Sequence, residues 1–315
     1  MHCALKKTAV CNNIQMKIIP YILIIVFGLF TGCNVNSYTF DENLAFQSLE
    51  KQAKWVHRYP GGEDAPICRQ FLRESLEPYC DKYIEQDFTE TVKGKELELK
   101  NIIGIINPKA DKYIILASHY DNRPFSDKEK TIGLRQKPCP GANDGASSSA
   151  LLLETAKVLK AKKPKVGVII ALFDGEDYGK DDDSMYIGSR YFAKHINDIC
   201  EKKKVTFGIL LDMIGDKDLN IFIEQISNKT APKLVEKVWD CAKGLGYGDS
   251  FIPKVKYGIY DDHISLIEEG IDCIDIIDFD YKYWHTSHDT SDKCSPQSLK
   301  IVADVIIEFL YSDIE

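Results

Sequence analysis

The sequence predicts an α/β protein, a three-layer sandwich with a mixed, centrally parallel sheet flanked by helices. Three observations support this fold class. After about residue 110, buried strand-like runs alternate with helical patterns, the order that builds parallel sheets. The hydrophobic fraction is 44% over 315 residues, a globular composition. No repeat or linker divides the chain, so residues 41–315 are expected to form a single domain.

Helix and strand signals follow one another along the chain. Asp41 precedes apolar residues at helical spacing from Leu44 onward, so it is expected to cap a first helix. The alternating segments 83–91 and 97–106 flank a Lys-Gly-Lys turn and predict a β-hairpin. Further helices are expected at residues 68–76, 145–160, 231–243, 262–269 and 297–311, and further strands at residues 113–118, 165–173, 205–213, 219–224 and 271–279.

The N-terminal segment differs in charge from the rest. Residues 1–32 contain three lysines and no acid, so their removal would change the net charge from −8 to −11. Residues 18–30 are uncharged but shorter than the roughly 20 apolar residues that span a bilayer, and they fit the apolar region of a signal peptide. Residues 1–32 are therefore expected to direct export and not to form part of the folded domain.

The segment ends in Leu-Phe-Thr-Gly-Cys33, which resembles the lipobox of bacterial lipoproteins. The resemblance implies that residues 1–32 are a lipoprotein signal peptide and residues 33–40 a tether. It also implies an exported protein, anchored through lipidated Cys33 to a bacterial membrane and facing the periplasm. A cleaved signal for soluble export and an uncleaved anchor are the alternatives, and Met16 is an alternative start.

Composition excludes some classes of protein. The acidic net charge argues against a nucleic-acid partner, and the mean hydropathy of −0.23 excludes a multi-span membrane protein. Seven cysteines follow Cys33 without a CxxC pair, so a structural zinc knuckle is not expected. Cys68 and Cys80 are the best local candidates for a disulfide, and the alternative is that the cysteines are buried small hydrophobes.

Acids and histidines gather at the predicted strand ends. Ligands of α/β proteins bind at the carboxyl ends of the strands, so these residues should converge there. A carboxylate cluster with two histidines suits zinc, which would relieve the repulsion between the acids. The segments are residues 118–121 (SHYD), 141–147 (GANDGAS), 174–177 (DGED), 210–215 (LLDMIG) and 284–290 (WHTSHDT).

These motifs, together with residues 261–263 (DDH), resemble the zinc aminopeptidase-like fold of peptidase family M28, and within it the animal-type glutaminyl cyclases. The resemblance covers about residues 40–312 and implies a Zn²⁺ held by Asp144, Asp177 and His285. It implies Glu176 as the catalytic acid/base. Asp177 stands where the animal enzymes and the aminopeptidases have Glu, so its loop must approach the metal more closely. His288 has no family role and is expected to be exposed.

Cyclase and aminopeptidase share most of these motifs. His119 and Asp212 match ligands of the second metal in two-zinc aminopeptidases, and Asp212 also matches a hydrogen-bonding Asp of cyclases. Asp261 matches the cyclase Asp that acts beside the catalytic Glu, where aminopeptidases usually have Ser. Trp284 resembles an aromatic residue of the cyclase substrate pocket, with ordinary packing as the alternative. Residues 180–183 (KDDD) lack the Trp of the animal cyclases, so that pocket wall must differ.

The resemblance therefore implies a glutaminyl-peptide cyclotransferase with one zinc. Its substrates would be peptides or proteins with N-terminal Gln, which Glu176, Asp261 and Asp212 would convert to pyroglutamate with release of ammonia. One alternative is a di-zinc aminopeptidase that releases N-terminal residues. A second alternative is an inactive peptide-binding homologue, although every motif position still has a donor side chain. The oligomeric state is left open.

Overall fold

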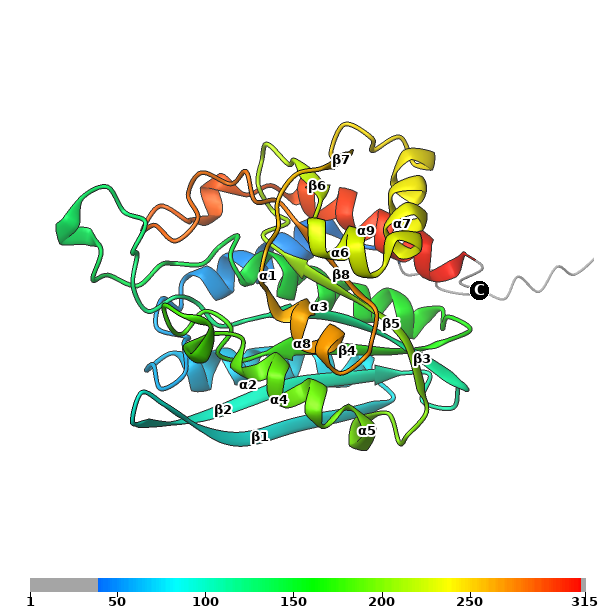
Figure 1. Cartoon of the computed structure of the whole chain (residues 1–315), viewed down its shortest axis with the longest axis horizontal. Helices are drawn as coiled ribbons and strands as arrows, with labels where there is room; N and C mark the ends of the chain where they lie inside the picture. The colour runs from blue at the N-terminus through cyan, green and yellow to red at the C-terminus, as the bar shows by residue number, and fades with distance from the viewer. Residues whose placement is uncertain (1–38, 313–315) are drawn as a thin grey trace, which may run out of the picture. The chain divides into compact units, whose positions relative to one another are not determined.

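A six-stranded mixed sheet forms the middle layer of the protein in the computed structural model, which describes residues 39–312 (Figure 1). The strand order is β1-β2-β4-β3-β5-β8. Strands β4, β3, β5 and β8 are parallel to one another, and β1, β2 and β4 pair antiparallel. The bounds are β1 (Lys82–Val92), β2 (Lys95–Ile106), β3 (Lys112–His119), β4 (Gly167–Phe173), β5 (Lys204–Asp212) and β8 (Cys273–Ile277). The predicted fold class is confirmed.

Two hydrophobic cores cover the two faces of this sheet. Neighbouring strand residues point into opposite cores, as Ile114 and Ile115 of β3 do. One core packs against α1 (Glu42–Ala53), α2 (Ala65–Leu76), α3 (Ala146–Ala161), α7 (Pro232–Gly244) and α9 (Pro296–Tyr311). The other packs against α4 (Ile187–Lys194), α5 (Ile196–Ile199) and α8 (Asp262–Glu268). Both sheet faces are therefore buried, which explains why the central strands are almost entirely apolar.

Short elements account for most differences from the predicted order. A second, two-stranded parallel sheet pairs β6 (Ile221–Ile223) with β7 (Phe251–Val255), and only β6 was expected. Helices α4, α5 and α6 (Gln225–Thr230) were not expected, because four to eight residues give too little periodicity. Single 3₁₀ turns lie at η1 (Glu77–Tyr79), η2 (Ile132–Leu134), η3 (Asp182–Ser184) and η4 (Ser291–Lys293).

The candidate disulfide between Cys68 and Cys80 is not formed, in agreement with the alternative that several cysteines are buried small residues. All seven cysteines within residues 39–312 are free thiols. Cys68 lies in the first turn of α2, whereas the Cys80 thiol lies 3.3 Å from the carbonyl of Leu76 at the other end of that helix. Eight residues of helix separate Cys68 from Leu76 by about 12 Å, beyond the reach of a disulfide.

The carboxyl ends of the parallel strands meet at one edge of the sheet. His119 is the last residue of β3 and Asp212 the last residue of β5, while Asp174 directly follows β4. This edge therefore collects the polar motifs that the sequence distributes over about 170 positions. Within residues 39–312, no helix is both long and apolar enough to cross a membrane. The predicted signal peptide and Cys33 lie outside the described residues.

Candidate metal centre and active site

Three side chains converge at the carboxyl edge of the sheet, and they are the three zinc ligands that the resemblance implies. Asp144 comes from the turn before α3, Asp177 from the loop after β4, and His285 from the loop after β8. His285 Nε2 lies 3.5 Å from Asp144 Oδ2 and 3.3 Å from Asp177 Oδ1. One donor atom of each lies within 4.8 Å of the others, and all three residues are buried. Such spacing allows one cation to contact all three.

The chemistry of these donors fits Zn²⁺. Two carboxylates and one imidazole form a common zinc ligand set. Asp144 Oδ2 and Asp177 Oδ2 are buried and have no hydrogen-bond partner, a costly state that a bound cation would relieve. The other ring nitrogen of His285, Nδ1, lies 3.6 Å from Asp127 Oδ1, the carboxylate–histidine arrangement typical of metal ligands. Asp144, Asp177 and His285 could therefore hold zinc.

Asp177 has a shorter side chain than the Glu expected at this ligand position, and a buried arginine holds it in place. Arg123, 3% exposed, donates from Nη1 to Asp177 Oδ1. Its Nε and Nη2 donate to Asp127 at 2.8 and 3.2 Å. Burial raises the pKa of Asp177, but His285 and Arg123 outweigh it and hold that pKa below its usual value. Arg123 thus keeps Asp177 ionised and links it to Asp127, the partner of His285.

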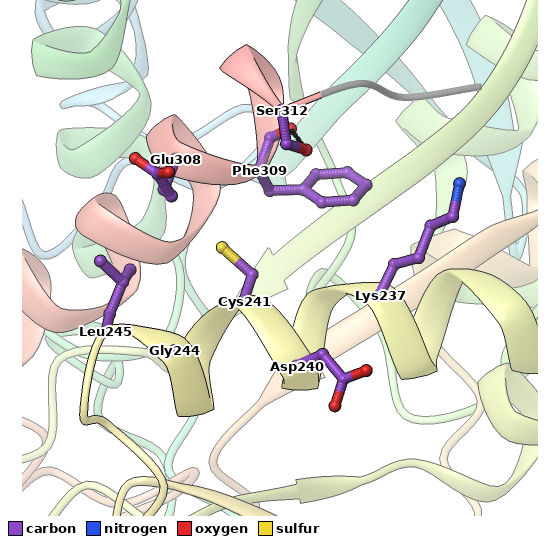
Figure 2. A pocket seen from close by; sticks show the side chains of 8 residues that line it. All are labelled: Lys237, Asp240, Cys241, Gly244, Leu245, Glu308, Phe309 and Ser312. Atoms are coloured by element: carbon purple, nitrogen blue, oxygen red, sulfur yellow. Dashed lines mark hydrogen bonds between the residues drawn. The ribbon is translucent and has the colours of Figure 1, made fainter.

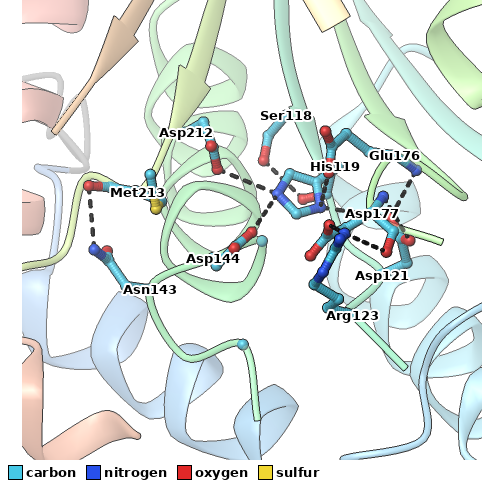
Figure 3. A network of polar contacts seen from close by, with 12 residues as sticks. Ser118, His119, Asp121, Arg123, Asn143, Asp144, Glu176, Asp177, Asp212 and Met213 are labelled. Atoms are coloured by element: carbon cyan, nitrogen blue, oxygen red, sulfur yellow. Dashed lines mark hydrogen bonds and ion pairs between the residues drawn. The ribbon is translucent and has the colours of Figure 1, made fainter. Parts of the chain in front are cut away.

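His119 lies among four carboxylates beside this centre (Figure 3). Its Nε2 is 3.2 Å from both Asp144 Oδ1 and Asp212 Oδ1. Its Nδ1 is 3.4 Å from Asp121 Oδ1 and 3.8 Å from Glu176 Oε2. Burial alone would lower the pKa of His119, but the surrounding carboxylates raise it well above its usual value. His119, Asp144 and Glu176 also form a second group of possible metal donors.

Glu176 is buried where it can exchange protons with a substrate at the centre. Burial raises its pKa well above the usual value, and Asp177 and Asp261 add to the increase while His119 opposes it. Burial and the neighbouring Asp212 raise the pKa of Asp261 to about 7. Since both acids favour the protonated form more than an ordinary carboxyl does, the cluster can hold protons near neutral pH.

Asp261 is a helix cap as well as a member of this cluster. Its side chain accepts the backbone N–H of Asp262 at the start of α8. It is 4% exposed, so Asp261 is a buried carboxyl and not a solvated one on the surface. The capping bond orients the Asp261 carboxyl from a rigid helix end.

Several residues that position the site carried no clear signal in the sequence. Asp121 accepts the backbone N–H groups of Glu176 and Asp177 at 3.2 and 3.3 Å. Asp289 accepts the backbone N–H groups of Asn143 and Asp144 at 2.8 and 3.1 Å. Both lie inside the quoted motifs, so motif membership was the only available signal. Arg58, which binds two site loops, lies outside every motif.

Trp284 and His288, the remaining predicted residues of the last motif, lie at the edge of the metal centre. The Trp284 ring stacks on His285 with centroids 4.0 Å apart and packs against Phe279 at 5.0 Å. Lys128 Nζ lies 5.0 Å from the centroid of the Trp284 ring. Trp284 is thus adjacent to the metal centre, and its contact with substrate stays a prediction. His288 is exposed as expected, with 65% of its side chain accessible.

A groove between α7 and α9 is unrelated to this site (Figure 2). It has a volume of about 490 Å³ and contains no member of the carboxylate and histidine cluster. Its lining residues are Lys237, Asp240, Cys241, Gly244, Leu245, Glu308, Phe309 and Ser312. The strand-end cluster is therefore the candidate active site.

An α/β sandwich with two carboxylates and a histidine placed for a divalent metal, beside a buried Glu, defines the class of zinc aminopeptidase-like enzymes. Within this class the chain belongs to peptidase family M28, whose signature matches residues 101–310. The glutaminyl-peptide cyclotransferase of Drosophila melanogaster is 26% identical over 75% of this chain and 71% of its own length.

Solved structures agree with this assignment. The glutaminyl cyclase of Bacteroides thetaiotaomicron is 32% identical, with a TM-score of 0.83 over 87% of this chain and 99% of that one. A Zn-dependent exopeptidase from Parabacteroides distasonis is 33% identical, with a TM-score of 0.84 over 88% of this chain and 99% of that one. The zinc aminopeptidase-like fold is confirmed. Because the cyclase and the exopeptidase resemble this chain to the same extent, the similarity does not discriminate between their two activities.

Proposed function

We propose that the chain is a glutaminyl-peptide cyclotransferase, which converts the N-terminal Gln of peptides and proteins to pyroglutamate and releases ammonia. The observation that carries the proposal is the buried Asp261, which adds a carboxyl with a raised pKa to the surroundings of Glu176 and Asp212. Aminopeptidases of this fold usually have Ser at that position. An additional acid raises the proton affinity of Glu176, which supports a role as proton shuttle.

The proposed reaction is intramolecular, so the protein has to orient one residue and move one proton. Zinc bound by Asp144, Asp177 and His285 would supply a Lewis acid for the side-chain amide carbonyl. Glu176 accepts a proton from the α-amine as the amine nitrogen attacks the side-chain amide carbon. Glu176 then delivers that proton to the departing nitrogen, which leaves as ammonia. One C–N bond forms and one breaks, so no further reactant is needed.

A second candidate function has one specific observation in its favour. Asp144 is grouped with Asp177 and His285, and both Asp144 Oδ1 and Asp212 Oδ1 lie 3.2 Å from His119 Nε2, so His119 and Asp212 could hold a second metal that shares Asp144. A carboxylate shared by two metals is the arrangement of a di-zinc aminopeptidase, in which Glu176 would activate water. The two functions differ in metal content and in products.

Peptides that begin with Gln or with Leu distinguish the two functions. The purified protein, loaded with Zn²⁺, is incubated with each peptide and the products are analysed by mass spectrometry and an ammonia assay. The cyclase proposal predicts a mass loss of about 17 Da, as ammonia, from the Gln peptide alone. Release of free leucine without ammonia, with two zinc ions per chain, would reject it in favour of the aminopeptidase.

We also propose that the protein is exported and anchored to a bacterial membrane through a lipid on Cys33, as the lipobox-like segment indicates. The expected result is that the full chain fractionates with membranes, whereas the Cys33→Ala variant does not. Equal membrane association of the two proteins would contradict the anchor.

A further inference from the structure

A second cavity opens beside the metal centre, and no part of the mechanism uses it. Its volume is about 520 Å³. It shares two loops with the centre, since Phe125 lies two residues after Arg123 and Tyr178 directly follows Asp177. The lining residues are Tyr59, Val92, Lys93, Lys95, Pro124, Phe125, Tyr178, Gly179, Lys180 and Ser184. We call this cavity the lysine–aromatic pocket.

Aromatic rings and lysines form its walls. The Phe125 ring contacts two cations, with the Arg123 guanidinium 4.5 Å and Lys180 Nζ 4.4 Å from its centroid. Lys95 Nζ donates to the Tyr178 hydroxyl at 3.0 Å. Cation–π attraction to Phe125 holds the Lys180 ammonium group at the pocket, and the bond to Tyr178 holds that of Lys95.

The charge of the pocket is positive although the chain is acidic overall. No residue that lines it is acidic. Lys93 is already paired, with Asp181 at 2.6 Å. In the described part of the chain, neither Lys95 nor Lys180 has a carboxylate within 4.0 Å. Two ammonium groups are therefore available to an anionic ligand, next to the site where a peptide N-terminus is processed.

We propose that the lysine–aromatic pocket binds an acidic side chain of the substrate, Asp or Glu, located two to four residues after the N-terminal Gln. The inference rests on the proposed function and adds a substrate preference to it. An extended peptide advances about 3.3 Å per residue. Successive contacts link Asp177 to Arg123, Arg123 to Phe125 at 4.5 Å and Phe125 to Lys180 at 4.4 Å, so a side chain a few residues after the N-terminal Gln is the one proposed to reach Lys180. Phe125 and Tyr178 cover the side-chain methylenes, and Lys95 and Lys180 pair with the carboxylate.

Two matched peptides test this proposal, Gln-Ala-Glu-Glu-Ala and its isosteric control Gln-Ala-Gln-Gln-Ala, each labelled at its C-terminus. Ammonia release is measured with the zinc-loaded protein, and Kd by fluorescence anisotropy with the Glu176→Gln variant. The acidic peptide is expected to bind about fivefold more tightly, because partly exposed ion pairs are weak and two act together. Its advantage should decrease at 0.5 M salt, since the screening length shortens.

The Lys95→Gln/Lys180→Gln variant should bind both peptides equally. A matched control, Lys229→Gln/Lys233→Gln, removes the same charge from exposed positions on α6 and α7 and should keep the preference. Equal binding of the two peptides by the unaltered pocket, no measurable binding of either, or a preference that survives loss of Lys95 and Lys180 would overturn the pocket assignment. Absence of ammonia from both peptides would instead reject the cyclase function. If the acidic peptide still bound more tightly than its amide control, the pocket assignment would stand.

Discussion

Arg58 connects the loops that present His119 and Asp144, and we predict that Arg58→Met destabilises the zinc-free protein by about 4 kcal/mol. The guanidinium is fully buried and donates to the carbonyl oxygens of Tyr120 at 2.9 Å, Pro140 at 2.6 Å and Gly141 at 2.6 Å. Each bond from a charged donor contributes about 1.5–3 kcal/mol. The cost of burying the charge, seen in the lowered pKa of Arg58, offsets part of their sum.

Gly141 makes this contact possible. Its φ of +65° is unfavourable for other residues, and a Cβ atom there would lie 2.5 Å from Arg58 Nη2. The loop therefore approaches the guanidinium closely before it reaches Asp144. Methionine has a comparable length without donors, so the substitution removes the guanidinium donor from the buried carbonyl oxygens of Tyr120 and Pro140 and leaves Gly141 O with only the Ala146 N–H at 3.3 Å.

Urea unfolding at equilibrium measures the loss of stability, and a competition titration with a chelator measures zinc affinity. The midpoint should decrease by roughly 1–2 M, and zinc should bind roughly 10–100-fold more weakly because two ligand loops lose their common anchor. Arg58→Lys should be intermediate. Arg73→Met is the control, since its side chain is 53% exposed and pairs with Glu77 on the surface, and it should leave the urea midpoint and the zinc affinity nearly unchanged. A loss below about 1 kcal/mol for Arg58→Met with unchanged zinc affinity would refute this account of Arg58.

Three further predictions concern the acids of the site. Glu176→Gln should lower kcat at least about a thousandfold while zinc content stays normal, and near-normal turnover would remove Glu176 from the mechanism. The raised pKa values of Asp261 (about 7) and Glu176 mean that the folded zinc-free protein binds more protons than the unfolded chain, so its unfolding free energy should fall as the pH rises from about 4 to about 7. Urea titrations in EDTA at pH 5 and pH 7.5 measure this slope, which Asp261→Asn should flatten; a slope that is flat or of opposite sign in the parent protein would contradict the assignment. Asp177→Glu should weaken zinc binding about tenfold, because the loop and Arg123 are arranged for the shorter side chain, and equal or tighter binding would show that this arrangement is unimportant.

The central architecture was predictable because its strands carry strong, local signals. The β1–β2 hairpin pairs Lys82 with Ile105 through Val92 with Lys95, around the turn that the Lys-Gly-Lys segment indicated. Strands β3, β4 and β5 are apolar runs between polar ends, as parallel strands with two buried faces have to be. Helices α4 to α6 were missed, since one or two turns between loops produce no periodicity that composition can reveal.

The site was partly predictable for a related reason. His119, Asp177 and Asp212 lie at a strand end or shortly after it, and Asp144 lies in the turn before the helix that follows β3. Topology alone brings such positions to one edge of a sheet. The pairing of Arg123 with Asp177 and of Asp289 with the turn before α3 could not be inferred, because neither pair is close in sequence. Cys68 and Cys80 form no disulfide because α2 separates them, and their spacing in the sequence does not reveal how far that helix extends.

The amino-acid sequence by itself determined the layer architecture, the edge of the sheet at which the motifs meet, and the resemblance to zinc aminopeptidase-like enzymes. Those features follow from periodicity and from short motifs, which are local properties of the chain. Only the tertiary structure decided which carboxylates are buried together, which cations compensate them, and how the lysine–aromatic pocket adjoins the metal centre. The physical reason is that burial and charge compensation depend on distances between segments about 50 to 150 residues apart, and those distances exist only after the sheet has assembled.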